Sequence, residues 1–288
     1  MNIFVYGTLM KGQSANHYLN GADYKGTFCL NGYAMYDIGS FPGIMEKENE
    51  SVIGEVYSIT EAMLPMMDRY EGEGSLYLRR EVIVERDGEK VIAWAYIYNN
   101  SVVNCPLKRN KWGITDDEYV WYACYGSNLS RERFRCYIKG GMCKANNKVY
   151  PGCRDASDWT EDKWKIFGGT IYFANKSPSW NGSGVAFYEP NYSRKTYMRL
   201  YKITWGQLKD VQDQEGNFPH WYGKMLCLGV DKDNCPIYTL TSEKPLESSC
   251  VKGEYYEVLR NALADKLHED GVDVDEYILG SSRYCHCP

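Results

Sequence analysis

Much of the chain alternates apolar and polar residues in short runs, which is the pattern of half-buried β-strands. Residues 52–59 are rich in β-branched side chains, and residues 81–85 and 91–98 flank Asp87-Gly88. That dipeptide is typical of a two-residue hairpin turn. Four later runs have the same character: 184–188, 198–203, 223–230 and 235–240. We expect the last two to pair as a second hairpin, so β-structure should dominate the fold.

One segment has the spacing of an amphipathic helix. Between residues 253 and 268, apolar side chains recur three or four positions apart, at Tyr256, Leu259, Leu263 and Leu267. A helix over this stretch would have one apolar face. We therefore predict a helix there.

Two parts of the chain repeat the same order of features. One apolar strand leads into Tyr6-Gly7-Thr8-Leu9, and a second leads into Tyr125-Gly126-Ser127-Asn128-Leu129. Farther on, a Leu/Met-rich stretch ends in Glu71-Gly72 in the first part, and a similar amphipathic stretch ends in Glu215-Gly216 in the second. A repeated order along one chain indicates two domains of one fold.

This repeat sets the expected domain boundaries. We expect a first domain at 1–104, a polar linker at 105–118 and a second domain at 119–288 that includes the C-terminal helix. The second copy is longer than the first, and its extra residues should lie between Lys139 and Trp180.

Composition narrows the class of protein. The chain has 288 residues and a net charge of −5, which argues against a general nucleic-acid binder with a basic face. No run reaches the roughly 20 apolar residues of a membrane span, and the N-terminus lacks the basic region of a signal peptide. We therefore expect a cytoplasmic protein that binds neither nucleic acid nor membrane.

The cysteines point to a reduced compartment rather than to a metal site. Their number, 11, is odd, and no CxxC pair occurs, so a structural zinc site is poorly supported. The one close cluster, Cys285-His286-Cys287, has its residues too near one another for the usual zinc spacing. We expect no metal and no cofactor.

Both copies resemble the γ-glutamylcyclotransferase-like superfamily. The first copy, about residues 1–100, is similar to the short branch that includes the butirosin-pathway cyclotransferase and γ-glutamylamine cyclotransferase. Its matching segments are Tyr6-Gly7-Thr8-Leu9, residues 36–43, Gly54-Glu55-Val56-Tyr57, Asp68-Arg69-Tyr70-Glu71-Gly72, residues 77–80 and residues 95–98.

The second copy, about residues 119–270, looks closer to γ-glutamylcyclotransferase proper. Its matching segments are Tyr125-Gly126-Ser127-Asn128-Leu129, residues 181–186, Asp213-Gln214-Glu215-Gly216 and Trp221-Tyr222. Each motif alone is weak, but their order, spacing and duplication make the resemblance specific.

The resemblance implies an α+β fold in which each domain is a small mixed β-barrel with a few helices. It also implies a reaction that frees 5-oxoproline from a γ-glutamyl amine or γ-glutamyl amino acid. Glu71 and Glu215 would be the catalytic general acid/base residues. The residues expected to bind the small-molecule γ-glutamyl substrate are Tyr6, Gly7, Thr8, Leu9, Tyr77, Tyr125, Gly126, Ser127, Asn128, Leu129 and Tyr222.

These residue types suit that chemistry. The substrate's α-amine attacks its own γ-carbonyl, so holding one conformer supplies much of the rate and no external nucleophile is needed. A single carboxylate can take the proton from the amine and return it to the leaving group. Desolvation by aromatic walls would raise the pKa of that carboxylate. The glycine turns would let backbone N–H groups approach the substrate.

Other interpretations remain open for several of these residues. Glu71 and Glu215 could be surface glutamates before helix-capping glycines, and Tyr6 and Tyr125 could be core side chains. The tyrosines that follow the glutamates could be ordinary strand aromatics. We interpret Asp68, Asp213 and His220 as surface or loop residues, and Cys124 as a buried small hydrophobe.

The function also has alternatives. One domain could be catalytic while the other only binds a γ-glutamyl ligand or a partner, or both could be non-catalytic. The insertion contains Trp159, Trp164 and Trp180, which could cover the second pocket. The leaving amine and the oligomeric state cannot be derived from the sequence.

Overall fold

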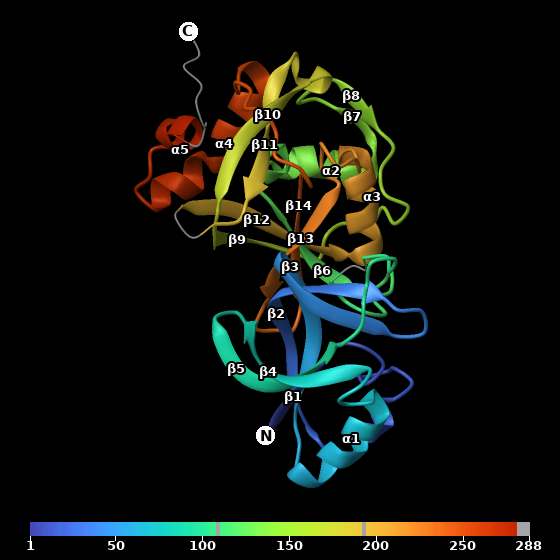
Figure 1. Ribbon diagram of the computed structural model, residues 1–288. Helices are drawn as coiled ribbons and strands as arrows, with labels where there is room; N and C mark the ends of the chain where they lie inside the picture. The colour runs from blue at the N-terminus through green and yellow to red at the C-terminus, as the bar shows by residue number, and fades with distance from the viewer. Residues whose placement is uncertain (108–109, 192–193, 281–288) are drawn as a thin grey trace. The chain divides into compact units, whose positions relative to one another are not determined.

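The computed structural model describes residues 1–107, 110–191 and 194–280, and it divides the chain into two compact units (Figure 1). Unit 1 comprises Met1–Ile114 and Cys227–Ile237, and unit 2 comprises Thr115–Leu226 and Tyr238–Pro288. Each unit is described below by itself.

Unit 1 is a closed five-stranded barrel with the strand order β1-β3-β2-β4-β5. Its strands are β1 (Asn2–Val5), β2 (Asp23–Asp37), β3 (Pro42–Ser58), β4 (Tyr77–Arg86) and β5 (Glu89–Tyr98). β1 pairs antiparallel with β3 and parallel with β5, at Ile3 and Trp94. The mixed barrel expected from the resemblance is confirmed for this unit.

The barrel interior follows from alternation along the strands. On β4, Val82 and Val84 are buried, whereas Ile83 between them is 61% exposed, because successive side chains of a strand face opposite sides. The turn between β4 and β5 is the predicted one: Asp87 and Gly88 have φ values of 45° and 88°. Both angles are positive, as this kind of hairpin turn requires.

Three short helices complete unit 1: η1 (Asn16–Leu19), η2 (Glu61–Met63) and α1 (Leu64–Glu71). α1 has one buried side chain, Met67. It packs into an apolar cluster that is separate from the barrel interior and that also contains Ile3 and Val5 of β1. This packing brings the C-terminal end of α1 to the end of β1.

A five-stranded sheet has the order β13-β14-β6-β12-β9, and its strands β6, β12 and β9 belong to unit 2. The strands are β6 (Tyr119–Cys124), β9 (Glu161–Gly168), β12 (Lys195–Thr204), β13 (Lys224–Val230) and β14 (Pro236–Thr241). Two further pairs are β10 (Thr170–Ser177) with β11 (Ser183–Glu189), and β7 (Gly141–Cys143) with β8 (Lys148–Tyr150). The expectation of a barrel in the second copy is wrong, because the strands described there form separate open sheets. Among the described residues, only the strands of unit 1 close into a barrel.

The helices of unit 2 are η3 (Ser127–Leu129), α2 (Arg131–Lys139), η4 (Pro178–Trp180), α3 (Trp205–Glu215), α4 (Gly253–Glu269) and α5 (Val274–Gly280). α4 confirms the predicted C-terminal helix. Its buried face is completed by Tyr255 rather than Tyr256, because Tyr255 lies four positions before Leu259. Tyr256 instead donates its hydroxyl hydrogen bond to Asp275 of α5.

The division into units differs from the boundaries expected from the sequence. The segment taken as the start of a linker is attached to the barrel: Asp37 donates its N–H to the carbonyl of Pro106 at 2.9 Å, and Asn110 donates to Ser51 O at 2.6 Å. Residues 227–237, expected in the second domain, belong to unit 1, where Asn234 Oδ1 accepts the N–H of Thr27 at 2.8 Å.

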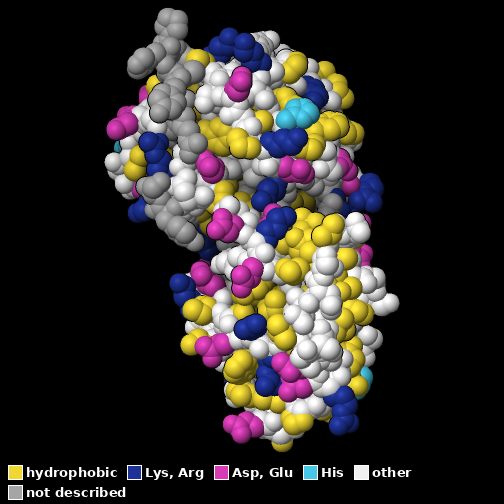
Figure 2. All heavy atoms as spheres, viewed as in Figure 1, with side chains coloured by type: hydrophobic (Ala, Val, Ile, Leu, Met, Phe, Trp, Pro, Cys, Tyr) yellow, Lys and Arg dark blue, Asp and Glu magenta, His cyan; other side chains and the backbone are white. Residues whose placement is uncertain are grey.

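The molecular surface carries mixed charge. On the face drawn in Figure 2, Lys and Arg side chains are scattered among Asp and Glu side chains, without a large area of one sign. Ion pairs such as Lys266 with Asp270, at 2.8 Å on α4, illustrate this mixing. No helix among the residues that the structure describes has the length and apolarity needed to cross a membrane.

The alternation on β4 predicts a sharp difference between neighbouring substitutions. Val84→Ala should lower the free energy of unfolding by about 1.5–3 kcal/mol, because it leaves a small cavity in the barrel core. Ile83→Ala, one position away and exposed, should change it by less than about 0.5 kcal/mol. Denaturant unfolding measures both, and equal effects would contradict the inside–outside assignment of β4.

Candidate functional site

The first candidate site is a cavity of about 380 Å³ in unit 1, between the turn after β1 and the end of α1. Glu71 is the one acidic or basic side chain in its described lining. The lining comprises Phe4, Val5, Tyr6, Gly7, Thr8, Leu9, Ser14, Ser40, Phe41, Pro42, Tyr70, Glu71, Leu76, Tyr77 and Tyr96. The cavity is therefore aromatic and nearly free of charge.

Two tyrosines form fixed walls of this cavity. The hydroxyl of Tyr6 donates to the carbonyl of Tyr96 at 2.6 Å, and that of Tyr77 donates to the carbonyl of Pro42 at 2.7 Å. Both side chains are buried. Because each hydroxyl is bonded to the backbone, the rings contribute shape and desolvation, and Tyr6 is a buried core side chain that also lines the cavity.

The turn after β1 needs glycine and presents free donors. A Cβ on Gly7 would lie 2.7 Å from Cγ of Pro42, so a larger residue would displace the turn. Met10 closes the turn by donating its N–H to Gly7 O at 3.0 Å. Among the described residues, no acceptor engages the N–H of Thr8 or Leu9. Thr8 and Leu9 line the same cavity as Glu71.

Glu71 is the last residue of α1, and a left-handed glycine ends the helix after it. Gly72 has φ 64° and ψ 46°, a conformation that costs glycine little. Burial raises the pKa of Glu71 from 4.5 to about 7, because the carboxylate loses water. No donor among the described residues bonds it. A carboxyl that titrates near neutrality can both accept and return a proton.

Asp68, one turn before Glu71, is not a surface charge as the sequence suggested. Nη1 of Arg79 lies 2.7 Å from both of its carboxylate oxygens, and the hydroxyl of Tyr96 donates to it at 2.8 Å. These bonds fasten α1 to β4 and β5. Asp213, its counterpart in unit 2, is exposed as expected.

The second candidate site is a cavity of about 270 Å³ in unit 2. It is lined by the turn after β6 and by residues of α2, β8, η4, β11, α4 and the end of α3. Here the hydroxyl of Tyr125 donates to the carbonyl of Leu240 at 2.6 Å, and that of Tyr222 donates to the carbonyl of Ala186 at 2.8 Å. Tyr125 and Tyr222 thus make the same kind of bond as the two wall tyrosines of unit 1.

Glu215 ends α3 as Glu71 ends α1, and Gly216 follows it with φ 103°. Nδ2 of Asn128 donates to Oε1 of Glu215 at 2.7 Å. Burial raises the pKa of Glu215, whereas the charge of Arg133 and hydrogen bonds from Tyr137 and Asn128 oppose that rise. Glu215 is therefore a desolvated carboxylate with donors around it, unlike Glu71.

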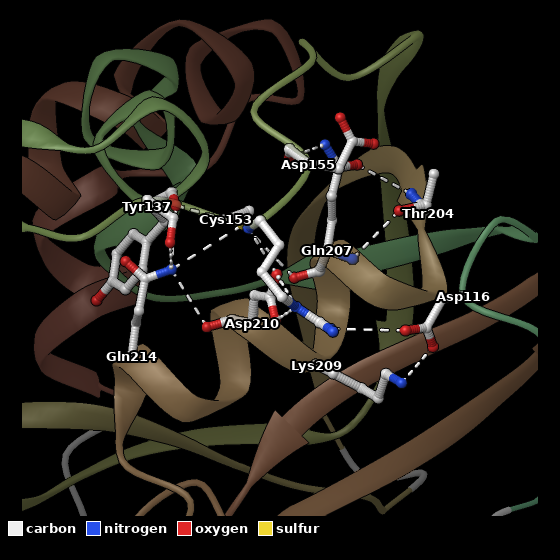
Figure 3. A network of polar contacts seen from close by, with 11 residues as sticks. Asp116, Tyr137, Cys153, Asp155, Thr204, Gln207, Lys209, Asp210 and Gln214 are labelled. Carbon is white, nitrogen blue, oxygen red and sulfur yellow. Dashed lines mark hydrogen bonds and ion pairs between the residues drawn. The ribbon is translucent and has the colours of Figure 1, made fainter.

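A polar network holds α3, and with it Glu215 (Figure 3). Nε2 of Gln214 donates to the carbonyl of Tyr137 at 3.1 Å and to that of Gly152 at 3.3 Å, and Gln207 donates to the carbonyl of Asp155 at 2.9 Å. Nε of Arg154 bonds Asp210 at 2.9 Å. Sequence reasoning gave Gln214 no role, because its partners are backbone carbonyls that no side-chain pattern identifies.

Not every residue singled out from the sequence reaches a cavity. Gly126, Ser127 and Asn128 line the second one, but Leu129 does not. The Leu129 side chain is buried, because the 3₁₀ turn η3 directs it into the core. Leu9, the third residue after Tyr6 as Asn128 is the third after Tyr125, does line the cavity of unit 1.

The remaining candidates separate in the same way. Of the three insertion tryptophans, Trp180 lines the second cavity, Trp159 packs against Phe134 and Tyr201, and Trp164 lies beneath Arg199. His220 is exposed and outside the lining, and Cys124 is buried as expected.

The lining of the second cavity also contains residues that the sequence did not indicate. They include Arg133 and Tyr137 on α2, Lys148 and Tyr150 on β8 and Tyr255 on α4. The available signal was an arginine at position 133, among the apolar residues Phe134, Tyr137 and Ile138 of the same helix face. Arginine is almost never fully buried unless it is paired.

No group of three or more metal-ligating side chains occurs among the residues that the structure describes. The Cys285-His286-Cys287 cluster lies outside the described residues.

Comparison with known proteins connects this arrangement to a family. The family model of γ-glutamyl cyclotransferase, AIG2-like, matches residues 3–120. The γ-glutamylcyclotransferase family protein YtfP of Escherichia coli K12 is 36% identical over 102 residues, which cover 35% of this chain and 86% of that protein.

Two further matches are more limited. Histone deacetylase 5 of Arabidopsis thaliana is 35% identical over 153 residues, but the match spans only 23% of the plant protein. The crystal structure of YkqA from Bacillus subtilis aligns over 93% of this chain and 96% of that chain, with a TM-score of 0.40 and 17% identity.

The raised pKa of Glu71 predicts how its removal affects stability. An acid whose pKa is higher in the folded protein destabilises the fold above its unfolded pKa, because the folded state disfavours the charge. Glu71→Gln should therefore raise the free energy of unfolding by about 2–3 kcal/mol at pH 8. This gain in unfolding free energy should decrease as the pH falls below 7, and it should be lost near pH 4.5.

Chemical unfolding between pH 4.5 and 8 measures this difference. Glu73 is exposed and lies two residues after Glu71. Glu73→Gln therefore removes one negative charge from the same turn without changing a desolvated group, and it is the control. A gain for Glu71→Gln that is constant across this pH range would contradict the desolvated state of its carboxylate.

Proposed function

This chain belongs to the γ-glutamylcyclotransferase (AIG2-like) family, and from that membership we propose that it releases 5-oxoproline from γ-glutamyl amines or γ-glutamyl amino acids. Glu71 and Glu215 are the proposed general acid/base residues. The observation that carries the proposal is a desolvated carboxylate that ends a helix and faces a glycine turn in each of the two cavities.

In unit 1 the reaction requires Glu71 to take up a proton from the substrate and then to give it back. Glu71 takes a proton from the substrate's α-ammonium, and the freed amine attacks the γ-carbonyl carbon to close a five-membered ring. The C–N bond to the leaving amine then breaks as Glu71 returns the proton to that nitrogen. The second proton that the ring nitrogen loses after the attack is also taken up by the departing amine, so the products are 5-oxoproline and an ammonium ion, and the protein is left unchanged.

The surroundings of Glu71 support this role. A pKa near 7 matches both proton transfers at neutral pH. The free N–H groups of Thr8 and Leu9 can stabilise negative charge on the substrate, either its α-carboxylate or the developing oxyanion. The tyrosine walls exclude water and hold the substrate in a cyclisation-ready conformer.

For unit 2 we propose a second copy of the same site. Its support is the correspondence of parts: a tyrosine before the glycine turn, a helix that ends in glutamate and glycine, and a second tyrosine bonded to a strand carbonyl. The family model ends at residue 120. A non-catalytic, ligand-binding unit 2 is therefore the alternative that the experiment below must separate.

The test is release of 5-oxoproline by the full chain, followed by mass spectrometry. The substrate panel contains γ-glutamyl amino acids, γ-glutamyl amines and γ-glutamyl-ε-lysine. Glu71→Gln and Glu215→Gln should each lower kcat by roughly 10²–10⁴-fold for the substrates of their own cavity, and the double variant should be inactive.

Each outcome assigns a role. Loss of all activity in Glu71→Gln alone makes unit 1 the catalyst and unit 2 a binding module. Full activity in the double variant, or no release by the wild-type protein on any substrate, removes the cyclotransferase proposal. Glu73→Gln and Asp213→Asn, both exposed, are the matched controls and should retain activity.

The donor on Glu215 predicts a shift in pH dependence. Asn128→Ala removes a hydrogen bond that lowers the pKa of Glu215. In a Glu71→Gln background, the acidic limb of the kcat profile should therefore move to higher pH, because Glu215 must be ionised to accept the proton. An unchanged limb would show that Asn128 does not act on the ionised Glu215.

A further inference from the structure

Arg133 is a buried cation in the wall of the second cavity. The residue is 3% exposed, although it lies in a helix whose neighbours Arg131 and Arg135 reach solvent. Its guanidinium carbon lies 4.6 Å from the ring centre of Tyr137, 4.4 Å from that of Tyr150 and 5.6 Å from that of Trp180. The aromatic rings hold the guanidinium at the cavity and shield it from water.

The hydrogen-bond partners of Arg133 do not neutralise it. Nη2 donates to the hydroxyl of Tyr137 at 2.9 Å and to that of Tyr150 at 2.5 Å, and Nη1 lies 3.8 Å from Sγ of Cys143. Nε has no partner in the described part of the chain. No carboxylate among the described residues forms an ion pair with Arg133.

Such an arrangement is costly unless an anion completes it. An arginine stays charged even when buried, and buried charges are normally paired. The charge of Glu215 acts on Arg133 through space but is not in ion-pair contact with it. Arg131, two positions earlier on α2, shows the ordinary solution, with Asp162 at 2.7 Å on the exposed side.

We propose that Arg133 is the centre of a carboxylate-binding subsite in the second cavity. Lys148 lines the same cavity and holds its ammonium 5.1 Å from the ring centre of Tyr150, where it adds positive charge at the solvent side. The proposal rests on the proposed function, since it locates the substrate beside Glu215.

A carboxylate fits this position better than a phosphate. The planar fork of arginine matches two carboxylate oxygens, and the nearby Glu215 would repel a dianion more strongly than a single charge. A γ-glutamyl substrate offers this group in two places. One is the α-carboxylate of the glutamyl moiety, and the other is a carboxylate on the leaving amine.

The contrast with the first cavity supports a ligand role. Its described lining holds no cation beside Glu71, so a carboxylate there can rely only on backbone and hydroxyl donors. The two cavities share the desolvated glutamate and the tyrosine walls. Positive charge is the feature that the second cavity adds.

The experiment compares two substrates in a Glu71→Gln background, so that turnover reports on the second cavity. γ-Glutamyl-alanine carries a carboxylate on its leaving amine, and γ-glutamyl-ethylamine is the same molecule without it. Arg133→Gln should raise KM by roughly tenfold to a hundredfold, the range expected for losing a charge-assisted pair. Arg131→Gln, the matched control, should change KM by less than about twofold.

The two substrates separate the two sources of the carboxylate. An equal rise in KM for both assigns Arg133 to the glutamyl α-carboxylate. A rise for γ-glutamyl-alanine alone assigns it to the leaving amine. An unchanged KM for both in a folded Arg133→Gln protein overturns the subsite.

A binding measurement keeps the subsite distinct from the catalytic proposal. Titration calorimetry of γ-glutamyl-alanine into the Glu71→Gln/Glu215→Gln double variant, with and without Arg133→Gln, reports affinity without turnover. Binding that depends on Arg133, together with a wild-type protein that releases no 5-oxoproline from any substrate, supports the subsite and removes the proposed function. Binding that does not depend on Arg133 counts against the subsite whether or not the chain is active.

Thermal unfolding checks that the variants fold. If Arg133→Gln is unfolded, Arg133→Lys replaces it, because lysine keeps the charge but not the bidentate fork. Arg133→Lys should weaken binding severalfold in both assays. An affinity equal to that of the parent protein would overturn the subsite.

Discussion

Withdrawal of a carboxylate from water at the end of a short helix is the constraint on which the rest of this structure depends. α1 ends at Glu71 and α3 ends at Glu215, and each is followed by a glycine in a left-handed conformation. A carboxylate placed there loses hydration, which raises its pKa. The surrounding elements must therefore be held firmly enough to prevent the helix end from turning back to solvent.

Each unit meets this constraint by different means. In unit 1, Arg79 and Tyr96 bind Asp68 and so fasten α1 to the barrel. In unit 2, Gln214 and Gln207 bond backbone carbonyls of α2 and of the loop after β8. The same helix end is thus stabilised by a half-buried ion pair in one unit and by amide donors in the other.

The two cavities also differ in charge. Glu71 faces an aromatic lining without a cation, whereas Glu215 shares its cavity with Arg133 and Lys148. Desolvation acts on both glutamates, but donors and positive charge oppose it only at Glu215. The same arrangement of glutamate and tyrosine walls is therefore combined with different charge in the two cavities.

The sequence by itself determined the local features. The hairpin at Asp87-Gly88, the helix at Gly253–Glu269 and the order of tyrosine, glycine turn and glutamate in each half all depend on residues close together in the chain. The tertiary structure decided the rest, because it depends on contacts between distant segments. It selected Tyr255 over Tyr256 for the core, paired the half-buried Asp68 with Arg79, turned Leu129 away from the cavity and placed Arg133 in the same cavity as Glu215. Periodicity specifies which side of an element is apolar, but only packing specifies what that side meets.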